Sequence, residues 1–202
     1  MRHLLVSALA LVLLTGCEID LSQRVVYTPE PRAAELEGSR WPDPPVRYCI
    51  VRSDDAFVDH DVLVELTAEA FEQWGVDAVD NGDCPGPQKE ANGRNEISWS
   101  NLGDGDMRLN EAGATNIRYR STDNRTPVII EADIVLDVDP PRDQRNEKCL
   151  HTVLLHETGH FLGLPHLNDP AIMAPVINEC EPDLHPEDQQ ALTALYPGEI
   201  AQ

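Results

Sequence analysis

Two segments of the chain repeat apolar residues at intervals of three and four, which is the period of an amphipathic helix. The first runs from Asp61 to Trp74 and the second from Glu147 to Leu162. Gly163 follows the second, and glycine readily takes the left-handed conformation found just after helices. A third helix is predicted from Pro186 to Tyr196, because proline is favoured at the first helical position. We therefore expect three helices.

Other segments alternate apolar and polar residues, as half-buried strands do. Val46–Val51 predicts one strand, and the surroundings of Ile97 and Ile117 predict two more. Val128–Leu136 gives the clearest alternation. Its two faces would carry Ile130, Ala132, Ile134 and Leu136 on one side and Glu131, Asp133 and Val135 on the other. Residues 81–92 are rich in Gly, Asn and Pro and predict a long loop.

The amino-terminal residues indicate export. Arg2 precedes an apolar run from Leu4 to Leu14, which is shorter than the roughly 20 residues that span a bilayer. We expect residues 1–16 to be a cleaved signal peptide. The sequence LTGC that ends at Cys17 resembles the lipobox of bacterial lipoproteins, which implies a lipid on Cys17 and an extracytoplasmic protein anchored to a bacterial membrane. An ordinary secretory peptide with an incidental cysteine is the alternative.

The remaining chain divides into two parts. Residues 17–44 are polar and rich in Pro and Glu, which predicts a tether. Residues 45–202 have the length of one domain. The net charge is −21, from 15 Lys and Arg against 36 Asp and Glu. This charge argues against binding to nucleic acid or to an anionic membrane surface. We expect a monomer whose only membrane contact is the lipid.

Four cysteines remain once Cys17 is lipidated, and an even number in an exported chain predicts two disulfides. Three pairings are open to them. We favour Cys49 with Cys84 and Cys149 with Cys180, because each closes a local loop. A four-cysteine metal site would need close CxxC pairs, which the sequence lacks.

The second predicted helix contains the pattern HExxH. His156 and His160 are four residues apart, so they stand one turn apart on one face and can bind the same ion. Glu157 adjoins them and could accept a proton from a water on that ion. It is the candidate general base.

His166 is the candidate third ligand, since catalytic zinc usually takes three protein ligands and leaves one position for water. A continued helix would carry His166 past the ion, so the chain must turn after His160. Gly163 permits that turn, and Pro165 prevents the helix from resuming. The whole pattern is HExxHxxGxxH.

This pattern resembles the metzincin metalloendopeptidases, and HETGHFLGLPH is most similar to their matrixin branch. Met173, in the sequence AIMAP, resembles the methionine turn beneath the metal of metzincins. Leu184–Tyr196 resembles the closing helix of matrixins, and the helix that ends at Trp74 and the strand around Ile134 occur in the expected order. The resemblance spans about residues 45–197. It implies an α+β domain with a twisted mixed β-sheet, an active-site helix, a Met-turn and a carboxy-terminal helix.

The resemblance also implies an activity, namely zinc-dependent hydrolysis of peptide bonds in protein substrates, with Glu157 as the base. The strand Val128–Leu136 would be the sheet edge that binds substrate, and residues 175–177 would wall the pocket beside the metal. The alternative is a catalytically silent lipoprotein that uses the site to bind zinc or a protein partner. Intact Glu157 argues against it, because binding alone needs no base.

The sequence departs from matrixins at several points. Leu167 follows the third histidine where matrixins usually have Ser, and Ala174 replaces a usual Tyr. There is no HxD pattern for a structural zinc. The stretch between Cys17 and Pro45 is too short for a prodomain, so we expect no cysteine switch.

Other candidate ligands are weaker. The run GDGDMRLNE offers several oxygens that could bind Ca²⁺, but we favour a solvated acidic loop, because the spacing is not that of an EF-hand. Those residues are Asp104, Asp106, Asn110 and Glu111. We expect His60, His151 and His185 to be surface or structural residues.

Overall fold

The computed structural model describes residues 39–86, 91–102, 112–120, 127–176 and 179–197. Cys17 and the acidic run from Asp104 to Glu111 lie outside the described residues. No helix within those ranges is long and apolar enough to cross a membrane. The elements in chain order are β1 (Val46–Ile50), α2 (His60–Trp74), β2 (Ala78–Asp83), β3 (Glu96–Ser100), β4 (Gly113–Arg120), β5 (Val128–Asp137), the 3₁₀ turn η1 (Arg142–Gln144), α3 (Glu147–Phe161) and α4 (Pro186–Leu195).

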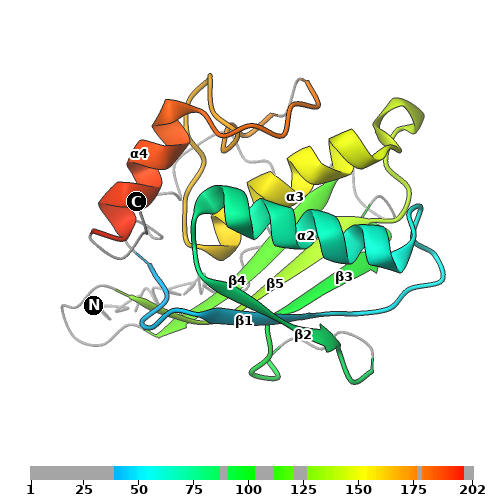
Figure 1. Cartoon of the computed structure of the whole chain (residues 1–202), viewed down its shortest axis with the longest axis horizontal. Coiled ribbons are helices and arrows are strands. Elements are labelled where there is room, and N and C mark those ends of the chain that lie inside the picture. Colours follow the sequence, from blue (N-terminus) through cyan, green and yellow to red (C-terminus); the bar gives the residue numbers. More distant parts are fainter. Residues whose placement is uncertain (1–38, 87–90, 103–111, 121–126, 177–178, 198–202) are drawn as a thin grey trace, which may run out of the picture.

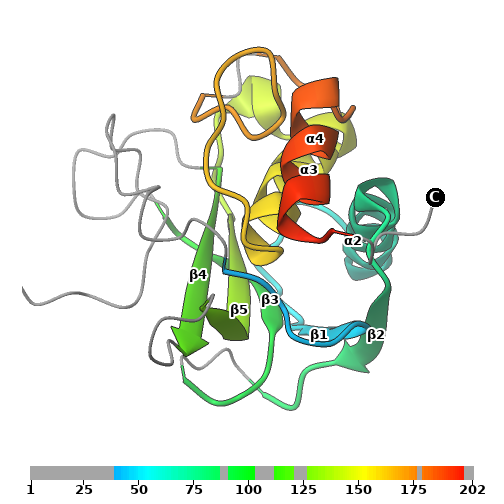
Figure 2. The same ribbon diagram turned by 90° about the vertical axis from the view of Figure 1, so that its left-hand side faces the viewer.

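In the described part of the chain, a mixed sheet of five strands forms the base of the domain, in the order β2-β1-β3-β5-β4. Neighbouring strands run parallel except for β4, which is antiparallel to β5. The helices α2 and α3 lie on the same face of this sheet (Figures 1 and 2). The α+β fold and the mixed sheet are confirmed.

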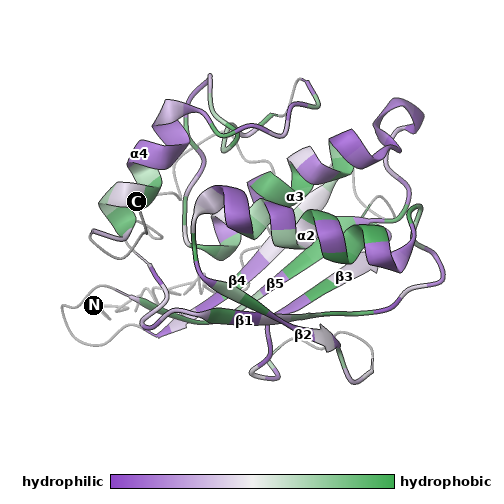
Figure 3. Cartoon of the chain, viewed as in Figure 1, coloured by the Kyte–Doolittle hydropathy of each residue, from purple (hydrophilic) through white to green (hydrophobic). Residues whose placement is uncertain are grey.

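The hydrophobic core lies between the sheet and the helices. In α2 polar and apolar residues alternate along the helix, as expected when one face is buried (Figure 3). By contrast, α3 is buried from Cys149 to Phe161, so its polar residues lie inside the protein. Buried polar groups are costly unless they are hydrogen-bonded or bind an ion. The pattern HExxH is therefore in the interior, where it needs partners.

The strand β5 corrects one expectation. Arg118 pairs with Glu131 but Tyr119 pairs with Ile129, so a bulge occurs at Ile130. The bulge reverses the inward and outward alternation at this point. Ile129 is consequently buried, and Ile130, expected on the same face as the buried Ala132 and Ile134, is 39% exposed. From Ala132 onward the predicted faces hold.

The expectation that Val128–Leu136 forms an edge of the sheet is also wrong. The strand β5 lies between β3 and β4 and is not an edge. The edge near α3 is β4, whose chain direction is opposite to that of β5.

At the other edge, β2 was not predicted, because its sequence AVDNGD is mostly exposed and polar and runs into the expected loop. Alternation arguments favour interior strands, since an edge strand buries less of its surface.

The packed part of the chain begins before Pro45, where the sequence placed the end of the tether. The indole nitrogen of Trp41 donates to the carbonyl of Phe161 at 2.9 Å. The hydroxyl of Tyr196 accepts from the backbone N–H of Trp41 at 3.1 Å and donates to the carbonyl of Leu162 at 2.7 Å. These contacts join the first described residues to the ends of α3 and α4.

Both favoured cysteine pairings occur in the structure. Cys49–Cys84 joins β1 to the end of β2, and Cys149–Cys180 joins the first turn of α3 to the chain that follows the methionine turn. The second disulfide thus links two segments on either side of the HExxH pattern in sequence.

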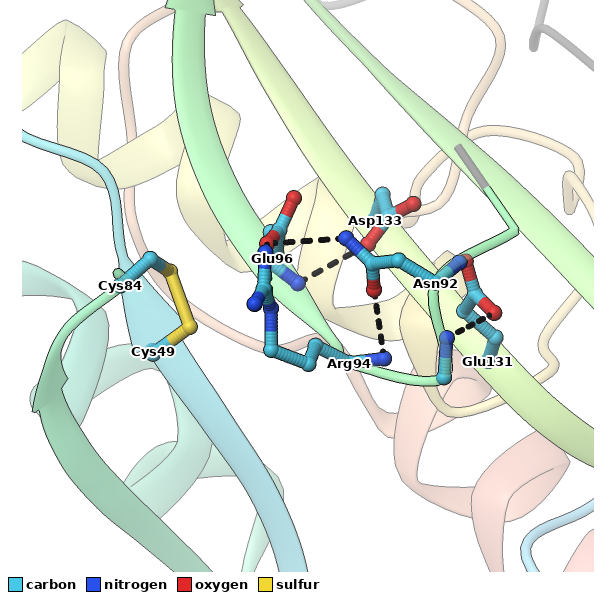
Figure 4. Close-up of polar contacts among 8 residues, drawn as sticks. Cys49, Cys84, Asn92, Arg94, Glu96, Glu131 and Asp133 are labelled. Carbon is cyan, nitrogen blue, oxygen red and sulfur yellow. Dashed lines mark hydrogen bonds and ion pairs between the residues drawn. A yellow bond between two sulfur atoms is a disulfide. The ribbon is translucent and has the colours of Figure 1, made fainter. Parts of the chain in front are cut away.

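Three buried carboxylates, of which Glu96 lies nearest the Cys49–Cys84 disulfide, accept bonds from the loop between β2 and β3 or from the first residue of β3 (Figure 4). Glu131 accepts from the backbone N–H groups of residues 92 and 93 and from Arg118. Glu96 pairs with Arg94, and Asp133 accepts from the N–H of Glu96. Because these donors satisfy the buried charges, the three carboxylates hold the loop between β2 and β3 in place.

Candidate metal centre and active site

The helix α3 sets the spacing of the first two candidate ligands. Asn146 caps its start by accepting from the N–H of Cys149 at 3.0 Å. One turn apart near its end, the Nε2 atoms of His156 and His160 face each other at 3.0 Å. The helix therefore brings the two imidazoles together as the sequence predicted.

Each of these rings is oriented by a backbone carbonyl. The Nδ1 atom of His156 lies 2.7 Å from the carbonyl oxygen of Ile172, and that of His160 lies 2.8 Å from the carbonyl oxygen of Leu164. A carbonyl only accepts, so both Nδ1 atoms carry the proton and both Nε2 atoms of the neutral rings are bare. Two lone pairs at 3.0 Å repel unless a cation lies between them. The donor set therefore fits a metal ion.

A turn after α3 brings in the third ring. Gly163 has φ of 95°, and its N–H donates to the carbonyl of His160 at 2.7 Å. The N–H of Leu164 donates to the carbonyl of Gly159 at 3.0 Å, which completes a Schellman motif. A Cβ atom at residue 163 would lie 2.1 Å from the carbonyl oxygen of Ser39. Glycine is thus required there for both its φ and its space.

The three imidazoles converge on one point. A ligand nitrogen from each of His156, His160 and His166 lies within 4.8 Å of the other two. Two nitrogens bound to one tetrahedral zinc at about 2.0–2.1 Å stand about 3.3 Å apart, so this cluster has the size of a zinc site. Three nitrogen ligands also leave one position open for a water or a substrate, as catalytic zinc requires.

Burial keeps these rings neutral. Desolvation, with a smaller contribution from the neighbouring His166, lowers the pKa of His156 to about 4. The pKa of His160 falls well below its ordinary value for the same reasons, and burial lowers that of His166. Neutral imidazole is the form that binds metal. The site is therefore ready to bind a cation at neutral pH without first losing protons.

Glu157 lies at the contact between α3 and the start of β4. It is 4% exposed, and its Oε2 atom accepts from the hydroxyl of Thr115 at 2.6 Å. Gly113, the first residue of β4, lies so close that an added Cβ atom would be 2.9 Å from the Cγ of Glu157. The candidate base is thus held by the edge strand as well as by its own helix.

Met173 is fully buried against α3. An added Cβ atom at Gly159, which stands between the ligand histidines, would lie 2.2 Å from the Sδ of Met173 and 2.7 Å from Cζ2 of Trp74. The carbonyl of Met173 accepts from the N–H of Leu167 at 2.9 Å, which ties the turn to the segment after His166. The methionine therefore packs under the helix turn that carries two ligands.

Asp188 is a site residue that sequence reasoning missed. Its buried carboxylate accepts from the N–H groups of Ile172 at 2.8 Å, Met173 at 3.1 Å and His185 at 2.9 Å. Ile172 in turn orients His156, so Asp188 supports a metal ligand at one remove. The only sequence signal was its place at the third position of a helix that begins with Pro186. That position indicates a helix cap, but it does not indicate the hydrogen bonds to Ile172 and Met173.

The other histidines lie elsewhere. His60 contacts Asp83, His151 contacts Gln73 between α2 and α3, and His185 caps α4. None of the three joins the metal cluster. Of the expected pocket wall, Pro175 and Val176 are exposed, and residue 177 lies outside the described ranges.

The comparisons agree with this geometry. The sequence model of the matrixin family matches residues 40–197, which include the five-stranded sheet, the helices α2, α3 and α4, and the metal cluster. No curated protein matches the chain. The match extends over more than half of the chain and begins at the segment that packs against α3. The chain therefore belongs to the matrixin family of zinc metalloproteases.

Proposed function

We propose that this protein is a zinc-dependent endopeptidase in which Glu157 is the general base. The observation that carries the proposal is the convergence of three neutral imidazoles within 4.8 Å, with a buried carboxylate on the residue next to one of them. A site that only bound zinc would need the three rings but not the carboxylate. The family match supports the same reading.

The residues would divide the chemistry between them. Zinc, when bound by the three histidines, supplies a Lewis acid that polarises the scissile carbonyl and makes a water more acidic. Glu157 accepts the proton of the attacking water and then donates it to the leaving nitrogen. Because the carboxylate is buried beside Thr115, it is shielded from bulk water, which strengthens its interaction with the developing charges.

Substrate would bind along β4. Among the described residues, β4 pairs with β5 on one side and with no strand on the other. An extended peptide could add to the outer side as another strand through backbone hydrogen bonds. Gly113 and Thr115 at the start of β4 contact Glu157, so a peptide there would pass close to the base.

Replacing the base tests the mechanism. The variant Glu157→Ala should retain zinc, because the three ligands are unchanged, and should lose about a hundredfold to ten-thousandfold in kcat, the usual contribution of general base catalysis. We would measure zinc by atomic absorption and cleavage of a proteome-derived peptide library. Chelator-treated wild type is the control for loss of metal. Equal cleavage by Glu157→Ala and wild type would reject the mechanism.

We also propose that the protein is exported and held at a bacterial membrane by a lipid on Cys17. Labelling cells with a fatty acid analogue should mark the wild-type protein and leave the Cys17→Ser variant unmarked. If neither protein takes up the label, the lipid anchor is excluded.

A further inference from the structure

Thr115 is a buried polar residue on the side of β4 that faces the helices. Ile117, two residues further on, lies on this side in the hydrophobic core, and Ile134, the partner of Thr115 on β5, is also in the core. A hydroxyl in such an apolar layer costs about 1–3 kcal/mol unless it is hydrogen-bonded. A polar residue among these neighbours indicates a specific partner.

That partner is the candidate base. The Thr115 hydroxyl lies 2.6 Å from Oε2 of Glu157 and 3.1 Å from the carbonyl oxygen of the same residue. An ionised carboxylate only accepts, so the hydroxyl donates. A distance of 2.6 Å is typical of the short, strong bond between a hydroxyl and a charged carboxylate. One oxygen of Glu157 is thereby fixed in position.

Gly113 sets the position of the other oxygen. It precedes Thr115 by two residues and lies on the same side of the strand. A Cβ atom at this position would lie 3.1 Å from Oε1 of Glu157, 2.9 Å from its Cγ and 2.8 Å from Cγ1 of Val153. Any side chain here would push the carboxylate away from its present place. The absence of one keeps that volume clear.

We propose that Thr115 and Gly113 are positioning residues for Glu157. Thr115 fixes Oε2 by a hydrogen bond, and Gly113 leaves room for the carboxylate in this orientation, in which Glu157 takes the proton of the attacking water. This inference rests on the proposed function, because it assigns the two residues to the same base. Neither residue acts on substrate directly, and both act through the orientation of the carboxylate.

The first test compares two buried threonines in the full-length, zinc-loaded chain. Thr115→Val keeps the shape and removes the hydroxyl, and it should lower kcat by about tenfold to a hundredfold, as expected when a catalytic group is misplaced by about 1 Å. KM and zinc content should not change. Thr115→Ser restores the hydroxyl and should recover kcat to within about threefold.

Thr67→Val is the matched control. Thr67 is equally buried, on α2, and its hydroxyl has no hydrogen-bond partner among the described residues. The same substitution there should leave kcat at the wild-type value. Gly113→Ala tests the second contact without altering the hydroxyl, and it should also lower kcat with zinc retained. If Thr115→Val does not fold, the kcat of Gly113→Ala tests the positioning role instead.

A second measurement needs no activity. In metal-free protein, Thr115→Val should lower the urea midpoint of unfolding clearly in the wild-type background and much less in the Glu157→Gln background, because the two residues interact directly. Equal shifts in both backgrounds, together with unchanged kcat, would overturn the inference.

The two proposals fail in different ways. A zinc-loaded wild type that cleaves no peptide rejects the endopeptidase and the positioning role together. A wild type that cleaves peptides while Thr115→Val and Gly113→Ala cleave them equally fast rejects only the positioning role.

Discussion

The ligand histidines are neutral at the residue scale because burial removes the water that a charged imidazole needs. His156 is the clearest case, with a pKa near 4 against an ordinary value of 6.5. In the unfolded chain the same ring is hydrated and takes up a proton below about pH 6.5. Folding and proton binding therefore compete in acid.

This competition predicts the pH dependence of the metal-free protein. A pKa lowered by folding contributes stability above the unfolded value, and that stability is lost as the pH falls from 6.5 towards 4. A shift of this size in His156 is worth about 3 kcal/mol, and His160 acts in the same direction. Urea unfolding at several pH values with a chelator present would measure it. The variant His156→Asn should show a shallower decline, and a wild-type free energy that stays constant down to pH 4.5 would contradict the prediction.

The convergence of the three candidate ligands was predictable because their spacing is local. A spacing of four residues on a helix places His160 one turn after His156. The turn at Gly163 then brings His166 back toward both rings. The supporting residues Asp188 and Thr115 were not predictable, since they reach the site from α4 and β4. Which side chain meets which across a domain depends on packing that no local pattern contains.

At the scale of the element, the end of α3 is the critical feature, because its turn decides where His166 lies. Gly163→Ala should lower the free energy of unfolding by about 3 kcal/mol or more, combining the cost of a positive φ with a clash against the Ser39 carbonyl. Zinc affinity should fall as well.

Gly82 provides the matched comparison. Its φ of 79° is similarly positive, but an added Cβ atom meets nothing within 4 Å. The variant Gly82→Ala should therefore cost only about 1 kcal/mol and leave zinc affinity unchanged. Thermal unfolding and zinc titration would measure both variants. Equal losses in the two would show that backbone strain alone, and not the contact with Ser39, explains the effect.

The helices were predicted to within one residue at each end, because each has a clear period and a recognisable start or stop. The prediction of the strands was less complete than that of the helices. The edge strand β2 has too little burial to produce alternation, and the bulge at Ile130 interrupts the alternation of β5 in a way that no residue type signals. Strand order also escaped prediction, since it depends on pairing between distant segments.

At the scale of the whole molecule, the two disulfides restrain similar lengths of chain, with sequence separations of 35 and 31 residues. Loop-closure entropy gives each about 4 kcal/mol at most. Replacing either pair by serines should therefore lower the unfolding free energy by a comparable amount, about 2–4 kcal/mol. Urea unfolding under oxidising conditions would measure this.

The two pairs should differ in their effect on catalysis. Only Cys149–Cys180 fastens the chain after the Met-turn, which we expect to border the substrate, to α3. Its removal should raise KM, whereas removal of Cys49–Cys84 should not. Steady-state kinetics of both double variants, at a temperature where each is folded, would compare them. Identical KM values would show that the second disulfide has no role in binding substrate.

The contacts of Trp41 decide where the amino-terminal segment leaves the domain. It leaves beside the carboxyl end of α3, where the indole bonds to Phe161 and the Ser39 carbonyl lies against Gly163. Tension along that segment would thus load the turn between His160 and His166 through Ser39 and Trp41, and the sheet through Arg40, which pairs with Val128 of β5. A copy of the domain pulled from this end would feel mechanical force at β5 and at the turn that leads to His166, whereas one pulled only from its carboxyl end would feel it first at α4.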